Sequence, residues 1–439
     1  MASLEELRIE RLKKLETLKS KNVNAYPIEV NYDATLLEAN TLFSKLSKKK
    51  KGITLVGRVT ALRGQGAIIF FNFFDGTGTF QGLFKKDGMD EKIFSLFNDT
   101  VDIGDFIEVT GTLFVTKRKE KTILVKNWRI LAKSLRPLPD KWHGLQDVEE
   151  RFRRRYLDTI MSPEVRTRFI IRASLISSLR EYLDKASFLE VETPILQSLP
   201  GGALAEPFKT HHNALDTDLY LRIAPELYLK KLLVGGFNKV YELSRNFRNE
   251  GIDVTHNPEF TMLEYYEAYS DATKQMEFVE KMLKFVIKKV SKKGIIIYGE
   301  DKIDFSKKFA HISFFDLLKR YALIVNPGEA TKQELTHKAN QLAVDVKPTD
   351  SVEKIMDNIY KKVCRPRLIQ PTFITDYPVS FSPFAKRKEK NKNFIDRFQL
   401  IVGGVELVNA FSELNDPVDQ RERYDDQEKK RLGGEKDIS

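Results

Sequence analysis

The stretch RNFRNEGIDVTHNPEF at residues 245–260 decides how the second half of this chain folds and what it can bind. Its pattern indicates two antiparallel strands joined by a charged turn. Arg248 can make charge-assisted hydrogen bonds to a phosphate and offset the charge that develops there during an attack. Glu250 can accept a hydrogen bond from an exocyclic amino group, and Phe260 offers a flat face to a base. Two arginines and a glutamate alone would fit an ordinary charged hairpin, but the whole string favours a nucleotide site.

Four further sequence strings, before and after this stretch, restrict which protein family it fits. They are PGGA at 200–203, HHNALD at 211–216, RIAPELYLK at 222–230 and FSELNDP at 411–417. Together with them, the opening stretch resembles motif 2 of the class II aminoacyl-tRNA synthetases. From about residue 50 to 425 the chain resembles the bacterial-type lysyl-tRNA synthetases. The resemblance implies an α+β multidomain protein, with an N-terminal OB-fold β-barrel followed by a class II catalytic domain whose antiparallel sheet is flanked by helices.

Length and composition set broad limits. With 439 residues the chain can form two or three domains with substantial cores. Lysine and arginine exceed the acidic residues by 73 to 62, and this excess favours a polyanionic partner such as nucleic acid. Cys364 is the single cysteine, so an intrachain disulfide is excluded and a cysteine-based metal site is unexpected. Because the sequence has no secretory signal and no apolar run of membrane length, we expect a cytoplasmic protein without membrane contact.

The pattern along the chain divides it into successive parts. We expect an N-terminal helical extension at 1–50, a barrel at 51–133, a linker at 134–150 and a catalytic domain at 151–439. Within the catalytic domain, residues 306–360 are predicted to be a helical insertion that carries no chemistry of its own.

Short strands separated by turns follow residue 51 and fit a five-stranded OB barrel, a fold that binds single-stranded nucleic acid. One strand, AIIFFNFFD at 67–75, is unusually aromatic. Alternation places half of its phenylalanines in the core and leaves the other face free to stack bases. The resemblance implies an anticodon-binding role for the residues that match the family's positions, which are Arg63, Phe70, Gln81 and Glu120.

Two basic segments have two interpretations each. Residues 3–21 predict a helix with a leucine face, and its lysines and arginines either contact RNA or are solvated while the helix packs on its own domain. RFRRRYLD at 151–158 is either a solvated helix start or a surface along which tRNA passes.

A candidate amino-acid pocket combines residues from several strings. Gly202 allows close approach of a ligand to the backbone. Glu226 precedes an apolar helix and can hold an ammonium group, although Ala-Pro-Glu is also an ordinary helix start. Glu264 and Tyr266 alternate toward one face of a strand. The resemblance implies a lysine-binding set that consists of Gly202, Glu226, Glu264, Tyr266, Asn409, Phe411 and Glu413.

The string VELVNAFSELND at 405–416 carries the remaining candidates. Carboxylates on a sheet that faces a nucleotide commonly coordinate Mg²⁺, which bridges phosphate oxygens. The resemblance makes Glu406 a Mg²⁺ ligand and Glu413 the partner of the lysine ε-ammonium. It implies an ATP-binding set of Arg248, Glu250, His256, Asn257, Phe260, Glu406 and Asn409. Of these, the candidate catalytic residues are Arg248, Glu250 and Glu406.

Two departures from the family pattern carry expectations. Gln399 stands at a usually acidic position, and because an amide oxygen is a weaker Mg²⁺ ligand than a carboxylate, we expect weaker occupancy of one metal site. No GxGxGxDR string occurs in residues 1–439, so motif 3, whose arginine grips the γ-phosphate of ATP in this family, is absent. We therefore expect exposed sheet edges. The chain would be a truncated enzyme, a partner of a second chain that supplies motif 3, or a protein that has lost activation chemistry.

The resemblance implies a lysine–tRNA ligase, which activates L-lysine with ATP to lysyl-adenylate and transfers the lysyl group to the 3′ end of tRNA(Lys). Residues 162–196 resemble motif 1, which implies a homodimer. One alternative is a catalytically impaired, synthetase-derived tRNA-binding protein. Another is the paralogue that lysylates a protein, but that family lacks the OB domain. Aspartyl and asparaginyl enzymes share the architecture, whereas Glu226 with Glu413 favours a cationic substrate.

Overall fold

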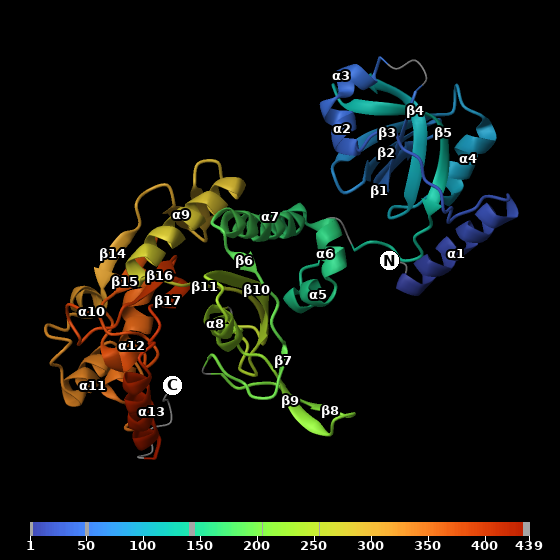
Figure 1. The fold of residues 1–439 in the computed structure, drawn as a ribbon. Coiled ribbons are helices and arrows are strands. Elements are labelled where there is room, and N and C mark those ends of the chain that lie inside the picture. Colours follow the sequence, from blue (N-terminus) through green and yellow to red (C-terminus); the bar gives the residue numbers. More distant parts are fainter. Residues whose placement is uncertain (1–2, 49–51, 140–144, 204, 254, 433–439) are drawn as a thin grey trace. The chain divides into compact units, whose positions relative to one another are not determined.

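The computed structural model of this protein describes residues 3–48, 52–139, 145–203, 205–253 and 255–432 (Figure 1). The chain divides into two compact units, Met1–Thr167 and Arg168–Ser439. Residues 49–51 of the predicted extension and barrel boundary, and 140–144 of the predicted linker, lie outside the described residues.

A closed barrel forms the centre of the N-terminal unit and confirms the predicted OB fold. Its strands, in barrel order, are β1 (Ile53–Gln65), β2 (Ile68–Phe74), β3 (Thr79–Lys85), β5 (Lys121–Ala132) and β4 (Phe106–Val115). β3 and β5 run parallel, and the other neighbouring strands run antiparallel. The helices of this unit are α1 (Leu4–Ser20), α2 (Leu36–Thr41), α3 (Phe43–Leu46), α4 (Glu91–Thr100), α5 (Val148–Arg153) and α6 (Arg155–Met161).

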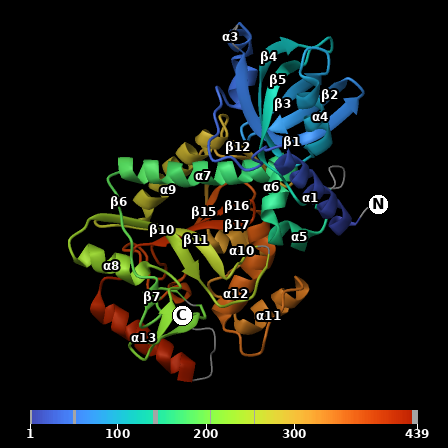
Figure 2. The same cartoon turned by 90° about the vertical axis from the view of Figure 1, so that its right-hand side faces the viewer.

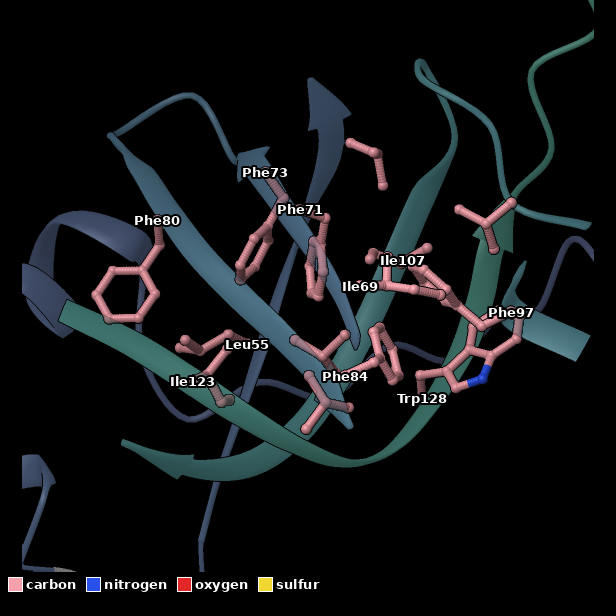
Figure 3. Packing of buried hydrophobic residues seen from close by; sticks show 14 of the residues in the cluster. Leu55, Ile69, Phe71, Phe73, Phe80, Phe84, Phe97, Ile107, Ile123 and Trp128 are labelled. Carbon is pink, nitrogen blue, oxygen red and sulfur yellow. The ribbon is translucent and has the colours of Figure 1, made fainter. Parts of the chain in front are cut away.

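Aromatic side chains fill the barrel (Figure 3). Along β2, Phe71 and Phe73 are 1% and 0% exposed and belong to the core, whereas Phe70 and Phe74 are only half-buried. This confirms the predicted alternation, which follows from the two-residue period of a strand. A Cβ at Gly82 would come within 2.0 Å of the Phe71 ring, so the aromatic core can close only with glycine at this position.

Helix α1 packs against the barrel through its leucine face. Leu15 and Leu18 are buried in the barrel core. Arg11 is also buried, and its guanidinium donates hydrogen bonds to three main-chain carbonyl groups at the end of the barrel. For this face of the helix, packing on its own domain is therefore confirmed, and contact of the remaining basic side chains with RNA stays a prediction.

The basic segment at 151–158 forms parts of α5 and α6. Arg151 and Arg155 both donate hydrogen bonds to the carboxylate of Asp158, which is 1% exposed. These two arginines therefore serve a structural role within the segment. A role of the segment in contacting tRNA stays a prediction.

Two sheets of the C-terminal unit carry the candidate site. The first sheet has the order β11 (Glu259–Glu267), β10 (Lys239–Phe247) and β6 (Leu189–Glu190). The second has the order β14 (Ala310–Ser313), β15 (Thr372–Thr375), β16 (Arg397–Val402) and β17 (Val405–Phe411). The β6–β10 and β14–β15 pairs are parallel, and the pairs that carry the candidate residues are antiparallel, as predicted.

Helices flank these sheets and position parts of the site. They are α7 (Pro163–Lys185), which begins in the N-terminal unit, α8 (Glu226–Val234), α9 (Ala272–Val290) and α13 (Pro417–Leu432). Figure 2 shows α8 beside β10 and β11, so this helix lies near the hairpin that these two strands form. The remaining strands are β7 (Leu196–Gln197), β8 (Lys209–His212), β9 (Thr217–Leu221), β12 (Ile295–Tyr298) and β13 (Asp301–Asp304).

Residues 306–360 differ from the predicted helical insertion. The segment contains α10 (Phe314–Ala322), α11 (Lys332–Gln341) and α12 (Val352–Ile359), but β14 precedes these helices and pairs in parallel with β15. A strand of four residues offers too few positions for its alternation to be recognised beside strong helical patterns. The segment is thus partly strand and supplies one edge of the second sheet.

The sheets end in strands that bear candidate residues. In the part of the chain that the structure describes, β11 and β17 are each the terminal strand of their sheet. Leu407 on β17 is 50% exposed. That these edges are exposed to solvent stays a prediction. None of the described helices is long and apolar enough to span a membrane.

Candidate active site

The candidate site is built on β10 and β11, and a buried ion pair supports this hairpin. Arg222 Nη1 lies 2.6 Å from Glu242 Oε1, and both side chains are almost fully buried. Thr193 Oγ1 donates to the other Glu242 oxygen at 2.6 Å, and Arg222 Nε donates to the carbonyl of Arg245 at 3.0 Å. Because every charged group of this pair is satisfied, it holds the end of β10 in place.

Arg248 follows β10 directly and lies against Phe260 on β11. Its guanidinium carbon is 5.1 Å from the centre of the Phe260 ring. Its backbone NH donates to the carbonyl of Pro258 at 2.9 Å. Nε of Arg248 is buried and has no hydrogen-bond partner among the described residues. An unpaired guanidinium NH beside an aromatic face suits a planar, anionic ligand.

Glu250, His256 and Asn257 lie in the exposed loop between β10 and β11. Asp253 organises this loop, since its carboxylate accepts main-chain NH groups and its Oδ2 lies 2.8 Å from His256 Nδ1. Within the described part of the loop, no hydrogen bond or ion pair joins the three predicted residues to the Arg248 side chain. The structure therefore brings Arg248 and Phe260 together, and among the described residues it shows no polar contact from these three to the Arg248 side chain.

Two carboxylates share one ammonium group at the start of α8. Lys230 Nζ lies 2.7 Å from Glu226 Oε1 and 2.7 Å from Glu413 Oε2. Glu226 is the first residue of α8, whereas Glu413 follows β17, so only the tertiary structure brings them together. Burial raises the pKa of Glu413 to about 7, although the charge of Lys230 acts in the opposite direction.

Glu264 on β11 adds a third carboxyl group to this pocket. Tyr266 OH donates to Glu264 Oε1 at 3.0 Å, while Oε2 of Glu264 is buried without a hydrogen-bond partner among the described residues. Burial, and after it the charge of Glu226, raises the pKa of Glu264 to about 7. Burial and the charge of Glu264 also raise the pKa of Tyr266. A buried carboxyl oxygen without a partner is suited to a cationic ligand.

Gly202 lies directly over Glu226. Its φ is 90°, a conformation that favours glycine, and a Cβ there would come within 2.9 Å of the Glu226 Cβ. The structure thus brings Gly202 to the acidic pocket, where the backbone can approach a ligand closely.

Glu406 and Gln399 face each other across β17 and β16. Gln399 Nε2 donates to Glu406 Oε2 at 2.9 Å, and Gln399 Oε1 accepts from Tyr377 OH at 2.6 Å. No group of three or more His, Cys, Asp or Glu side chains is arranged to hold a metal in the described ranges. Mg²⁺ in nucleotide sites commonly uses one or two carboxylates together with phosphate oxygens. Among the described residues, no donor bonds to Oε1 of Glu406. Glu406 can therefore supply the one carboxylate that such a Mg²⁺ site needs.

Asn409 and Phe411 also lie on β17. Asn409 Oδ1 accepts a hydrogen bond from Arg397 Nε at 3.0 Å. Phe411 is half-buried and packs against the core that the helices of the 306–360 segment form. Asn409 is therefore an exposed polar residue on the strand that carries Glu406, and Phe411 also supports the helical layer behind the sheet.

One face of the barrel gathers the predicted anticodon residues. Arg63 on β1 lies opposite Phe70 on β2, and Gln81 on β3 lies opposite Asn72, the next residue of β2 on the same face as Phe70. Gln81 Nε2 donates to Glu120 Oε2 at 2.5 Å, and both line a shallow hollow of about 440 Å³. An exposed arginine, an aromatic ring and a polar hollow suit single-stranded nucleic acid.

Three residues of the site escaped the sequence analysis. Lys230 could have been found from the sequence, because it stands four residues after Glu226 on a predicted helix, and this spacing favours an ion pair. Arg397 gives no signal, because its contact with β17 depends on strand register. Asn246 on β10 is fully buried, and neither its side-chain nitrogen nor its oxygen has a partner among the described residues. In the sequence, Asn246 could have been noticed as a polar amide side chain at a strand position that is expected to be buried.

Both units match known protein families. Residues 147–437 match the family described as tRNA synthetases class II (D, K and N), and residues 53–131 match the OB-fold nucleic acid binding domain. The lysine–tRNA ligase of Dehalococcoides mccartyi is 43% identical over 431 residues, covering 97% of this chain and 86% of that protein. The lysine–tRNA ligase of Pelotomaculum thermopropionicum is 44% identical over 437 residues, covering 99% of this chain and 86% of that protein.

Proposed function

This chain belongs to the class II tRNA synthetases, in the family of lysine–tRNA ligases, and from this premise we propose that it attaches L-lysine to tRNA(Lys) in an ATP-dependent reaction. The acidic pocket is the observation that supports the substrate best. Glu226, Glu264 and Glu413 come from three separate elements and act on one another electrostatically. A lysine side chain brings positive charge to these three carboxyl groups, whereas an uncharged side chain would leave part of their negative charge without a counter-charge.

In the first step, a carboxylate oxygen of lysine attacks the α-phosphorus of ATP. The bond from this phosphorus to the bridging oxygen breaks, pyrophosphate leaves, and lysyl-adenylate is formed. Arg248 offsets the charge that develops on the α-phosphate, and Phe260 stacks on the base. Because the substrate itself is the nucleophile, the side chains act by positioning and by charge stabilisation.

Glu406 would hold Mg²⁺ together with phosphate oxygens of ATP. When bound, this ion neutralises phosphate charge and acts as a Lewis acid. The hydrogen bonds of Gln399 to Glu406 and Tyr377 engage both ends of its amide, which supports weaker occupancy of a second metal position.

In the second step, the 3′-terminal ribose hydroxyl of tRNA attacks the lysyl carbonyl carbon and AMP leaves. We assign anticodon binding to the barrel face with Arg63, Phe70, Gln81 and Glu120. Phe70→Ala should weaken tRNA(Lys) binding by about 1–3 kcal/mol, the usual contribution of one stacked base, and should leave lysine activation unchanged. Tyr32→Ala, which removes another exposed aromatic side chain of this unit, is the matched control.

We propose a homodimer formed through α7. Phe169, Ile170 and Ile171 are exposed within one turn of this helix, and exposed large apolar side chains fit an interface. Sedimentation should give the mass of two chains, and Ile170→Glu should give the mass of one. We also propose that the protein acts in the cytoplasm, where its tRNA substrate occurs.

Lysine-dependent exchange of pyrophosphate into ATP, measured with the purified chain and a panel of amino acids, tests the function. We expect exchange in the presence of lysine and no exchange with any other amino acid of the panel. A chain that binds tRNA(Lys) but shows no exchange would instead be a catalytically impaired tRNA-binding protein. The gathered carboxylates and the unpaired Arg248 guanidinium favour the active enzyme over this alternative.

A further inference from the structure

The ammonium group of Lys230 lies between two of the three carboxyl groups of the acidic pocket, which is the cluster of Glu226, Glu264 and Glu413. It lies 2.7 Å from one oxygen of Glu226 and 2.7 Å from one oxygen of Glu413. The three side chains are 27%, 17% and 32% exposed, so water screens these contacts only partly. Burial would lower the pKa of Lys230, but Glu226 and Glu413 outweigh it and raise the pKa. The chain therefore places a permanent positive charge of its own inside the pocket.

Lys230 leaves acceptors free on every carboxyl group around it. A carboxylate has two oxygens, and Lys230 contacts Oε1 of Glu226 and Oε2 of Glu413. Among the described residues, no donor bonds to Oε2 of Glu226 or to Oε1 of Glu413. Oε2 of Glu264 is likewise without a partner and is buried. Each of the three carboxyl groups can thus accept from a ligand while Lys230 stays in place.

The charges balance only when Lys230 is counted. When all three carboxyl groups are ionised to hold ammonium groups, they and the Lys230 ammonium give the pocket two net negative charges. Lysine carries two ammonium groups at neutral pH, and its carboxylate is the group that attacks ATP. Without Lys230, the pocket would hold one negative charge more than its substrate can neutralise.

We propose that Lys230 is a positioning residue that sets substrate specificity: its ammonium remains between Glu226 and Glu413 when lysine binds, so that the pocket presents two net negative charges to an amino acid with two ammonium groups. The inference rests on the proposed function, because it concerns the same pocket. It assigns to Lys230 a part in recognition without direct contribution to the attack on ATP.

The charge of Lys230 should be visible in the pH dependence of lysine binding. Glu264 faces Glu226, Lys230, Arg248 and Tyr266, and Glu413 faces Lys230 and Glu226. In Lys230→Met the carboxyl groups lose their internal counter-charge and hold protons to higher pH. Lysine must then displace these protons, so binding should weaken about tenfold at pH 7 and recover at higher pH.

The test is isothermal titration calorimetry of lysine with the full chain between pH 6 and pH 9, in buffers of different ionisation enthalpy. For Lys230→Met, the pH of half-maximal affinity should rise by about one unit, and more protons should be released on binding. Lys230→Arg keeps the charge and should bind within about threefold of the parent. Lys231→Met removes the neighbouring exposed lysine, which lies over Tyr228, and should change nothing.

Three results would overturn this assignment. Tighter lysine binding by Lys230→Met at pH 7 would make Lys230 a competitor that the substrate displaces. An unshifted pH profile with normal affinity would make it a bystander. Equal loss in Lys230→Arg and Lys230→Met, with lower thermal stability in both, would make its role structural. If the parent chain bound no lysine at any pH, the proposed function itself would fail, and this inference with it.

Discussion

The two units of this protein both bury charged side chains, but the N-terminal unit pairs them, whereas the candidate site of the catalytic unit leaves some of its buried polar atoms without a partner. In the N-terminal unit, Lys133 Nζ lies 2.7 Å from Asp105 Oδ2 and 2.5 Å from Asp102 Oδ2. The side chains of Lys133 and Asp105 are fully buried, and Lys14 binds the other oxygen of Asp102 at 2.6 Å. This cluster connects the barrel to α1, and each charge has a partner of opposite sign.

The catalytic unit treats its buried polar groups differently. Oε2 of Glu264, Nε of Arg248 and the side-chain amide of Asn246 are buried without hydrogen-bond partners among the described residues. These three residues lie on or directly after β10 and β11, the strands that carry the candidate site. Since an unpaired buried polar group destabilises the folded state, such groups persist where a ligand completes them.

The two regions titrate in opposite senses. Burial would raise the pKa of Asp102, but hydrogen bonds from Lys133 and Lys14 outweigh it and lower the pKa. The stability that Asp102 adds is therefore present at neutral pH and lost as the pH falls through the lowered pKa. Glu264 and Glu413, with pKa raised from 4.5 to about 7, do the reverse: stability is lost as the pH rises from 4.5 to about 7. The paired charges of Lys133, Asp105 and Asp102 stabilise the barrel, whereas the carboxyl groups of Glu264 and Glu413 are available to bind a ligand.

Removing a paired charge should have the largest effect on stability. Asp105→Ala removes the fully buried partner of Lys133 and leaves only the partly exposed Asp102 as its counter-charge, so it should lower the free energy of unfolding of the N-terminal unit by about 3–5 kcal/mol. Urea unfolding followed by circular dichroism measures this loss, and Asp87→Ala, an exposed acid of the same unit, is the control. Lysine binding by the catalytic unit should stay unchanged. A loss below about 1 kcal/mol would place the cluster with ordinary surface ion pairs and break the comparison.

Removing Arg248, whose buried Nε has no partner among the described residues, should lower the rate of catalysis instead of the stability. Arg248→Ala should lower the rate of lysine-dependent pyrophosphate exchange by about 10²–10³-fold, because the charge that develops on the α-phosphate loses its partner. The affinity for tRNA should stay nearly the same. Arg320→Ala, an exposed arginine of α10, serves as the control in the same assay. Simultaneous loss of exchange and of tRNA binding would point to misfolding rather than to a role in the reaction.

Removing the open carboxylate should separate binding from stability. Glu264→Gln keeps the shape of the side chain but loses its charge, and should weaken lysine binding by about 1–3 kcal/mol. The free energy of unfolding should stay the same or rise by about 1 kcal/mol, because a buried charge without a partner is gone. Calorimetry and thermal unfolding give the two quantities, with Glu277→Gln on α9 as the exposed control. A strong loss of stability would show that Glu264 is already paired in the free protein.

The affinity for lysine should rise with pH from 6 to 8. Glu264 and Glu413 have a pKa of about 7 in the free pocket and must be ionised to hold ammonium groups. Affinity should therefore increase by about tenfold for each carboxyl group that loses its proton on binding, and level off above pH 8. The affinity for ATP, measured in parallel, should not follow this curve. A flat profile for lysine would mean that both groups are already ionised in the free protein.

Local patterns in the sequence were sufficient for much of the fold. The alternation of Phe71 and Phe73 with their neighbours predicted the interior of β2, because side chains of a strand point to opposite faces in turn. The same alternation predicted that Glu264 and Tyr266 share a face, and their side chains are hydrogen-bonded. β14 escaped prediction, since a strand of four residues gives too short a signal and its parallel partner β15 lies far along the chain.

The sequence by itself determined which residue types are available for the site and which family their order belongs to, because motifs such as residues 245–260 can be recognised from the order of their residues alone. Only the tertiary structure decided which of these side chains meet. Glu226 and Glu413 stand far apart in the chain, and the packing of α8 beside β10 and β11 places Lys230 between them. The physical reason is that burial and charge depend on neighbours in space, so the pKa of Glu264 and the pairing of Lys230 follow from the folded arrangement alone.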